Sequence, residues 1–221
     1  PLVKFMRRFL TTVYGLVISS NRRTILNALN QVKYGNAAKK MLYSSIVATN
    51  KKNVYSDVII AHFGSNGIIA NHLRELGVLS GKLATVYHGH ELSVNNTLSH
   101  YKKSYQQLFL CGDIHLPISD LWRNKLIELG CVANKVLVHR MGVDLASFNF
   151  QESKKLGHDK LKLFTVARFT EKKGIEYALK ALALLLQEGF SQFHYTIAGY
   201  GELKSKYLSL IDEYELSERV T

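Results

Sequence analysis

The stretch TVARFTEKKGIEYALKAL, residues 165–182, decides the fold. It opens with the end of an apolar strand and continues through a charged turn that contains Arg168 and Lys173. Apolar residues then recur at helical spacing, which predicts a helix over residues 174–188. Its expected buried face is Ile175, Ala178, Leu179, Leu182, Leu185 and Leu186. A strand that passes through a short turn into a helix is typical of a βα unit in a parallel sheet.

Further units of this kind lie on both sides of the stretch. The sequence predicts strands over residues 57–64, 83–89, 107–112, 115–119, 135–144, 161–169 and 193–202, and the start of another at 218–221. It predicts helices within residues 1–50 and over 66–76, 120–130 and 203–216, with Asp120 as the N-cap and Gly130 as the stop of the third. The alternation indicates an α/β protein with parallel sheets. A polar stretch after Asp144 lacks either rhythm and marks a domain boundary, which we place between residues 148 and 149.

The charge of the chain predicts an anionic partner. Its 221 residues carry a formal net charge of +12. A phosphorylated small molecule, an anionic membrane surface and nucleic acid are the three candidates. No nucleic-acid-binding signature accompanies the charge, so we expect no nucleic-acid partner. The two cysteines, Cys111 and Cys131, fit no metal-binding pattern and are expected to be free thiols.

Residues 9–18 form an apolar run between two arginine pairs. The run is too short to span a bilayer, and it is followed by a poor signal-peptide cleavage site. It is expected to be a helix. Whether that helix belongs to the core or lies on a membrane surface stays open.

The charged turn of the opening stretch suits a diphosphate. A helix N-terminus carries unpaired N–H groups and a partial positive charge. A guanidinium grips two phosphate oxygens and an ammonium acts as a point charge, so Arg168 and Lys173 would complete such a site. The Walker loop and the dinucleotide fingerprint are both absent. The alternative is a charged turn that is merely solvated.

Six motifs between residues 57 and 221 resemble those of retaining, sugar-nucleotide-dependent glycosyltransferases of the GT-B fold, in the group that includes family 4. Their order along the chain is also that of the family. The set is most similar to bacterial exopolysaccharide enzymes of the colanic acid and amylovoran type. The motifs are AHFGSNG (61–67), VYHGHE (86–91), LPISDLWRNKLIELG (116–130), VHRMGVDLASF (138–148), ARFTEKKG (167–174) and IAGYGEL (197–203).

This resemblance implies a GT-B-type α/β fold of two Rossmann-like parallel-sheet domains, both incomplete. Residues 1–148 would be the N-terminal, acceptor-side domain without its first strands. Residues 149–221 would be the first half of the C-terminal, sugar-nucleotide-binding domain. The family's Gly-rich loop would precede residue 1, and its Glu-x7-Glu motif would follow residue 221. We therefore expect a fragment that is inactive by itself.

The resemblance also assigns roles to individual residues. His88 would be catalytic, while Arg168 and Lys173 would bind the donor diphosphate. The backbone next to the donor would be formed by Gly89, Gly199 and Gly201. The residues expected on the acceptor side are His62, Gly64 and Asn66, for which turn geometry and capping are equally good explanations. Further residues in the motifs are His90 and Glu91, of uncertain role, and Gly142 and Asp144, expected as interdomain turn residues.

The implied function is retaining hexosyl transfer from a UDP- or GDP-sugar to a lipid-linked saccharide in exopolysaccharide or lipopolysaccharide biosynthesis. No metal and no cofactor are expected, because the sugar nucleotide is itself a substrate. The implied location is the cytoplasm, peripheral to the inner face of the cell membrane, where anionic lipids would attract a basic protein. A noncatalytic, carbohydrate- or partner-binding remnant of the same fold is the alternative. Activity of a complete form would distinguish the two.

Overall fold

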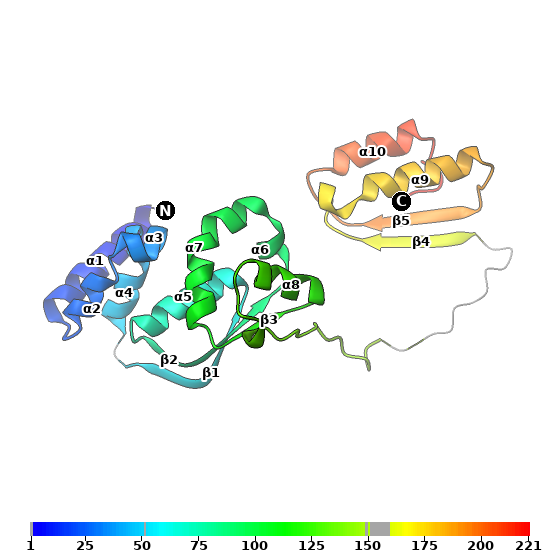
Figure 1. Cartoon of the computed structure of the whole chain (residues 1–221). Coiled ribbons are helices and arrows are strands. Elements are labelled where there is room, and N and C mark those ends of the chain that lie inside the picture. Colours follow the sequence, from blue (N-terminus) through cyan, green and yellow to red (C-terminus); the bar gives the residue numbers. More distant parts are fainter. Residues whose placement is uncertain (1, 51, 149, 151–159) are drawn as a thin grey trace. The chain divides into compact units, whose positions relative to one another are not determined.

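The computed structural model of the chain describes residues 2–50, 52–148, 150 and 160–221, except for the side chains of 95–97. The chain divides into a first unit, residues 1–144, and a second unit, residues 145–221. Each unit has its own parallel sheet and its own hydrophobic core (Figure 1). The parallel α/β architecture is therefore confirmed. Most of the polar stretch between the predicted domains, residues 151–159, lies outside the described residues.

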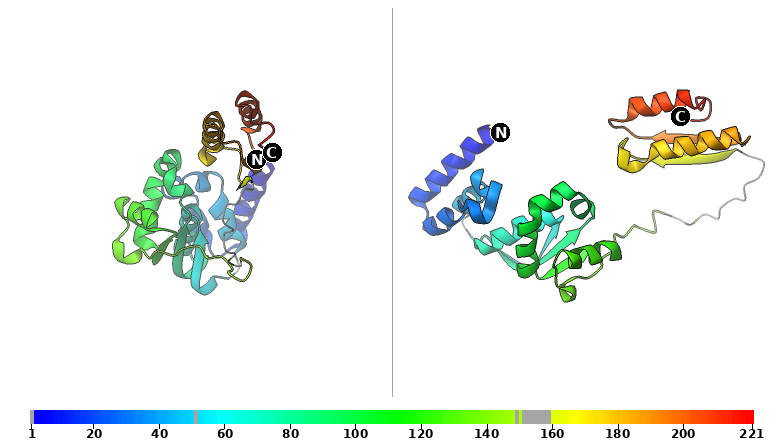
Figure 2. Two further views of the ribbon diagram at one scale, coloured as in Figure 1. Left: turned by 90° about the vertical axis from the view of Figure 1, so that its right-hand side faces the viewer. Right: turned by 45° about the horizontal axis from the view of Figure 1, so that its top comes forward.

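The first unit begins with four helices, as predicted for residues 1–50. They are α1 (Leu2–Ile18), α2 (Arg22–Asn27), α3 (Gln31–Lys39) and α4 (Leu42–Thr49). Figure 2 shows them as the blue end of the chain. Together with the later helix α5 (Gly64–Glu75) they enclose a small core of Ile25, Ala28, Tyr34, Ala38, Tyr43, Val47, Leu76 and Val78.

Of the apolar side chains of α1, Leu16 packs against this core and is half-buried. Within α1 only Thr12 and Gly15 are buried, and they pack against α4. The hydroxyl of Thr12 lies 3.0 Å from that of Ser44, and a Cβ on Gly15 would lie 2.4 Å from Cβ of Ala48. Residues 9–18 are therefore helical, as predicted, and pack on the core through Thr12, Gly15 and Leu16, while most other apolar side chains of the run are exposed.

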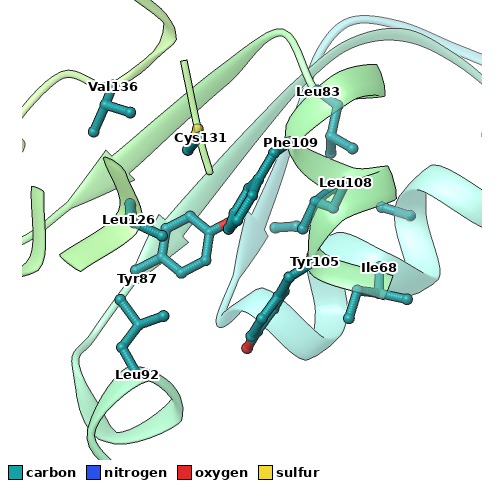
Figure 3. Packing of buried hydrophobic residues seen from close by; sticks show 12 residues of the cluster. Ile68, Leu83, Tyr87, Leu92, Tyr105, Leu108, Phe109, Leu126, Cys131 and Val136 are labelled. Atoms are coloured by element: carbon teal, nitrogen blue, oxygen red, sulfur yellow. The ribbon is translucent and has the colours of Figure 1, made fainter. Parts of the chain in front are cut away.

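The sheet of the first unit has three parallel strands in the order β1-β2-β3. The strands are β1 (Val54–His62), β2 (Leu79–Tyr87) and β3 (Ile114–Pro117), and the helices that follow them are α5 (Gly64–Glu75), α6 (His90–Ser93), α7 (Asn95–Cys111) and α8 (Asp120–Glu128). Helices and sheet enclose an aromatic-rich core, in which Tyr87, Tyr105 and Phe109 lie close together (Figure 3). This core fixes the ends of β1 and β2, where the candidate site lies.

Three predictions for this unit are wrong in detail. Residues 107–112 are not a strand but the end of α7, because Leu108 and Phe109 belong to a buried helical face with Tyr105. The N-cap of α8 is Ser119, whose hydroxyl accepts from the N–H of Trp122, so that Asp120 is already in the first turn. Residues 135–144 form no continuous strand: a 3-10 turn (Ala133–Lys135) leads to a single bridge of Val136 to β3.

The second unit contains two βα units, as the opening stretch predicts. They consist of β4 (Leu161–Val166), α9 (Ile175–Gln187), β5 (Phe193–Ala198) and α10 (Lys204–Glu213). Both helices cover one face of the β4–β5 pair (Figure 1). The predicted strand start is confirmed, since Val220 bridges Tyr195 in parallel and Thr221 exchanges backbone hydrogen bonds with β5. On α9 the buried residues are Ile175, Leu179, Leu182 and Ala183, whereas Leu185 is 38% exposed and was predicted wrongly.

Candidate functional site

The first unit brings two histidines together at the ends of neighbouring strands. His62 ends β1, and His88 follows the last residue of β2. Nδ1 of His62 lies 3.0 Å from Nε2 of His88, and the two rings are stacked with their centroids 5.2 Å apart. His62 is exposed and His88 half-buried, so the pair borders solvent. The geometry thus links the expected catalytic residue to a residue expected on the acceptor side.

The backbone at these strand ends explains how the rings meet. The parallel register places His62 opposite Val86, and the N–H of Phe63 donates to the carbonyl of Val86 at 2.8 Å. Phe63 has φ = 70°, which is unusual for a residue with a side chain and is found where surrounding contacts enforce it. Its ring packs against His88 with centroids 4.5 Å apart. Strained backbone of this kind concentrates at functional sites.

The glycines and the asparagine of this region have structural reasons of their own. A Cβ on Gly64 would lie 2.6 Å from the hydroxyl oxygen of Tyr105. Gly89 has φ = 93°, and a Cβ there would lie 2.4 Å from Nε1 of Trp122. The side-chain amide of Asn66 donates to the carbonyl of His62 at 2.8 Å and so holds the end of β1.

Glu91 is buried next to the backbone of His88, a position that the sequence did not predict. Its side chain is buried, and Oε1 accepts the backbone N–H of His88 at 3.0 Å. Oε2 is also buried and has no hydrogen-bond partner among the described residues, as is the case for the hydroxyl of Tyr105. Burial raises the pKa of the Tyr105 phenol, and the charge of Glu91 adds to that effect. The carboxylate therefore fixes the turn that carries His88, whereas its neighbour His90 is exposed.

The second unit places two cations at the turn between β4 and α9. Arg168 follows the end of β4, and Lys173 closes a 3-10 turn (Glu171–Lys173) that ends at Gly174, the N-cap of α9. Both side chains are exposed. Neither has an ion-pair or hydrogen-bond partner among the residues that the structure describes. Glu176 in the first turn of α9 is already paired with Lys206 of α10.

Gly199 and Gly201 allow the two loops at this end of the sheet to touch. A Cβ on Gly199 would lie 1.9 Å from the carbonyl oxygen of Ala167, and one on Gly201 would lie 2.6 Å from that of Phe169. The N–H of Phe169 donates to the carbonyl of Tyr200 at 2.7 Å, which ties the loop after β4 to the loop after β5. Larger residues would force the loops apart and displace the turn that carries Arg168.

The remaining predictions concern metals, membranes, thiols and the end of the first unit. Within the described ranges there is no group of three or more His, Cys, Asp or Glu side chains that could hold a metal ion. None of the described helices has the length and apolar character needed to cross a membrane. Cys111 and Cys131 are free, as predicted. Gly142 and Asp144 are exposed and lie where the first unit ends.

Comparisons with known proteins agree with this architecture. The family described as "Glycosyl transferases group 1" matches residues 147–221. The colanic acid biosynthesis glycosyltransferase named WcaL in Salmonella typhimurium is 42% identical over 217 residues, which are 98% of this chain and 52% of that protein. The amylovoran biosynthesis glycosyltransferase AmsK of Erwinia amylovora is 44% identical over 188 residues, or 85% of this chain and 46% of that protein. The chain spans about half the length of the curated relatives it matches.

Solved structures show the same fold at low sequence identity. HepE of Anabaena, crystallised with UDP, has a TM-score of 0.60 at 15% identity, covering 75% of this chain and 47% of that one. The lipopolysaccharide outer core galactosyltransferase WaaB has a TM-score of 0.53 at 15% identity, covering 91% of this chain and 47% of that one. Together with the family match, these findings show that the chain has an α/β fold of GT-B type and that its residues 147–221 match the domain of the group 1 glycosyl transferases.

Proposed function

We propose that the protein takes part in retaining transfer of a hexosyl group from a nucleoside-diphosphate sugar to a saccharide acceptor in exopolysaccharide or lipopolysaccharide biosynthesis. The observation that carries the proposal is the pair of exposed cations, Arg168 and Lys173, at the β4–α9 turn, whose side chains have no partner among the described residues. The relatives named for colanic acid and amylovoran biosynthesis support the choice of pathway.

The chemistry explains why two fixed cations are useful there. When the bond between the sugar's anomeric carbon and the diphosphate oxygen breaks, negative charge builds up on the departing nucleoside diphosphate. Arg168 and Lys173, beside a helix N-terminus, would stabilise that charge more in the transition state than in the ground state. Such an arrangement replaces a divalent metal, and we propose a metal-independent reaction.

His88 would act on the sugar or on the acceptor. The acceptor oxygen forms the new bond to the anomeric carbon and must lose a proton, which an imidazole or the departing diphosphate can take. The contact with His62 and the hydrogen bond that the His88 backbone N–H donates to Glu91 both hold this residue in place. Gly89, Gly199 and Gly201 would let the backbone approach the donor closely.

The donor and the location complete the proposal. A UDP-sugar is supported by structural neighbours that were crystallised with UDP and UDP-glucose, and a GDP-sugar is the other candidate. We propose a lipid-linked saccharide as acceptor, and a cytoplasmic protein peripheral to the inner face of the membrane. The positive charge of the chain supports contact with anionic lipids.

A panel of UDP- and GDP-sugars tests the proposal. Binding of the nucleotide is measured by calorimetry, and transfer is measured with lipid-linked saccharide extracts, with and without EDTA. The proposal expects binding of at least one nucleotide, transfer by the complete enzyme and no effect of EDTA. Binding without transfer by the complete enzyme would favour the noncatalytic remnant of the fold. Absence of any nucleotide binding would exclude the diphosphate site.

A further inference from the structure

The outer face of α1 is apolar along its whole length. At helical periodicity it lies opposite Thr12 and Gly15, the two residues that pack on α4. The side chains of this outer face are 43–82% exposed. They are Leu2, Val3, Met6, Leu10, Val13, Tyr14, Val17 and Ile18. An exposed apolar surface of this extent marks an interaction site.

The charged residues of the segment that contains this face, residues 1–56, all have one sign. The first acidic residue of the chain is Asp57, so all 17 Asp and Glu residues follow residue 56. Ten of the 29 Lys and Arg residues precede it, which leaves 19 basic residues against the 17 acidic ones in the rest of the chain. Nearly all of the net charge of +12 therefore belongs to the segment that contains α1. The ten are Lys4, Arg7, Arg8, Arg22, Arg23, Lys33, Lys39, Lys40, Lys51 and Lys52.

Three of these cations surround a hollow between α1 and α4. The hollow has a volume of about 390 Å³ and is lined by Lys4, Arg7, Arg8, Thr11, Ser45, Ile46 and Thr49. The hydroxyls of Thr11, Ser45 and Thr49 donate to carbonyls of their own helices, so the cations are its available donors. Arg8 makes one long hydrogen bond, 3.4 Å, to the carbonyl of Lys40. Among the described residues no ion pair neutralises Lys4, Arg7 or Arg8, and a phosphate group would do so.

We propose that α1 lies in the surface of an anionic lipid bilayer, with its apolar face among the acyl chains and a lipid phosphate group in the hollow beside it. An amphipathic helix that combines an apolar face with basic residues is the form of helix that lies in the interface plane. This inference deepens the membrane contact of the proposed function and rests on it.

The positive charge beside this face argues against two other binding partners, a second copy of the chain and a nucleic acid. A second copy of the chain would bring the same uncompensated cations against each other in a symmetric interface. Nucleic acid would neutralise the cations but would leave the apolar side chains in water. An anionic bilayer satisfies both parts of the surface.

Vesicle binding tests the inference. The purified protein is sedimented with vesicles of phosphatidylcholine alone and with vesicles of equimolar phosphatidylglycerol and phosphatidylcholine. We expect binding to the anionic vesicles only. The double variant Arg7→Gln, Arg8→Gln should lower the partition coefficient roughly 25-fold, and Leu10→Glu should lower it roughly 10-fold.

Matched variants control for charge and for apolar surface elsewhere. The double variant Lys102→Gln, Lys103→Gln removes the same charge from the exposed face of α7, and Leu208→Glu places the same acid at a residue that is 53% exposed on α10. Both controls should bind vesicles like the parent protein, and circular dichroism should show that all variants stay folded.

The outcomes separate the sources of binding. Release from vesicles by inorganic phosphate alone would mean that the hollow binds phosphate without a bilayer, and would overturn the inference. So would equal binding to neutral vesicles, or a dimer that Leu10→Glu dissociates while no vesicle binds. UDP binding is measured on the same samples and should be unchanged in the Arg7→Gln, Arg8→Gln double variant. If the parent protein itself did not bind UDP, the proposed function would be overturned instead of this inference.

Discussion

His62 and His88 lie ring against ring at the ends of β1 and β2, with Nδ1 of the first 3.0 Å from Nε2 of the second. In such a contact one nitrogen carries the hydrogen and the other accepts it. The tautomer of His88 is therefore coupled to that of His62. Under the proposed function, Nδ1 of His88, the ring nitrogen outside this contact, would be the one that interacts with a substrate hydroxyl.

Replacing either histidine in the complete enzyme should lower turnover, by different amounts. His88→Ala removes the group proposed to act on the reactants and should lower kcat on the order of 100-fold or more. His62→Phe keeps a stacked ring but removes the nitrogen, and should lower kcat roughly 10-fold with a changed pH–rate profile. Steady-state kinetics over a pH series measures both effects. A His62→Phe enzyme with the parent's rate and pH profile would show that the contact has no part in the reaction.

Arg168 and Lys173 should each be needed for donor binding and turnover. Loss of one charge-assisted phosphate contact costs about 1.5–3 kcal/mol, which is roughly a 10- to 100-fold loss in kcat/KM for Arg168→Ala or Lys173→Ala. Lys172→Ala is the matched control, because it removes an equally exposed lysine from the same turn. Steady-state kinetics with the preferred sugar nucleotide measures kcat/KM for all three variants. Equal losses in all three variants would point to general charge and not to a defined diphosphate site.

Gly199→Ala should damage the second unit. The added Cβ would lie 1.9 Å from the carbonyl oxygen of Ala167, which is backbone and cannot move aside cheaply. We expect a loss of stability of about 1–3 kcal/mol from overpacking, together with weaker nucleotide binding. Gly142→Ala is the control, because no atom lies within 4 Å of the added carbon and its φ is not positive. Urea denaturation and calorimetry should separate the two variants; similar behaviour of both would contradict the close contact.

Glu91 should act through the position of His88. Glu91→Gln keeps an oxygen that can accept the His88 N–H and replaces a buried carboxylate that has no ion-pair partner among the described residues, so stability should be unchanged or higher. Glu91→Ala leaves that N–H without its partner and should lower the free energy of unfolding by about 1–3 kcal/mol. In the complete enzyme, Glu91→Gln should preserve kcat, whereas Glu91→Ala should lower kcat with little change in KM. Equal losses of kcat in the Glu91→Gln and Glu91→Ala enzymes would instead show that the carboxylate itself is required.

The strand and helix pattern was largely predictable, because each βα unit combines a short apolar strand, a turn and a periodic helix. The errors occurred where one pattern fits two structures. Leu108 and Phe109 read equally well as strand or as a helical face with Tyr105, and only packing against the sheet decides. Ser119 and Asp120 are adjacent and both are good N-caps, so local chemistry could not choose between them.

The residues of the candidate site can be proposed from the sequence, but their geometry cannot be predicted from it. His62 and His88 were recognised separately, from strand ends and from the resemblance. Their contact depends on the register that sets His62 opposite Val86 and on the positive φ of Phe63, and neither can be read from sequence. The buried position of Glu91 depends in the same way on tertiary packing.

The pH dependence of stability should reflect a buried histidine in the core of the first unit. His115 is fully buried, with Nδ1 3.0 Å from the hydroxyl of Tyr87. Burial, with a smaller effect of the Lys135 charge, lowers the pKa of His115 from 6.5 to about 4. Between these two values the unfolded chain binds a proton that the folded chain does not. Stability is therefore full above about pH 6.5 and falls towards pH 4.

The expected loss between pH 7 and pH 4.5 is on the order of 2–3 kcal/mol for this group. His72, whose pKa is also lowered by burial, adds a loss of the same sign. Urea denaturation at a series of pH values measures the total. His115→Asn keeps a polar atom for Tyr87 but cannot titrate, so its stability should depend less steeply on pH, whereas His100→Asn, at an exposed position, should keep the parent's slope. Parallel curves for the parent and His115→Asn would show that His115 is not held neutral by burial.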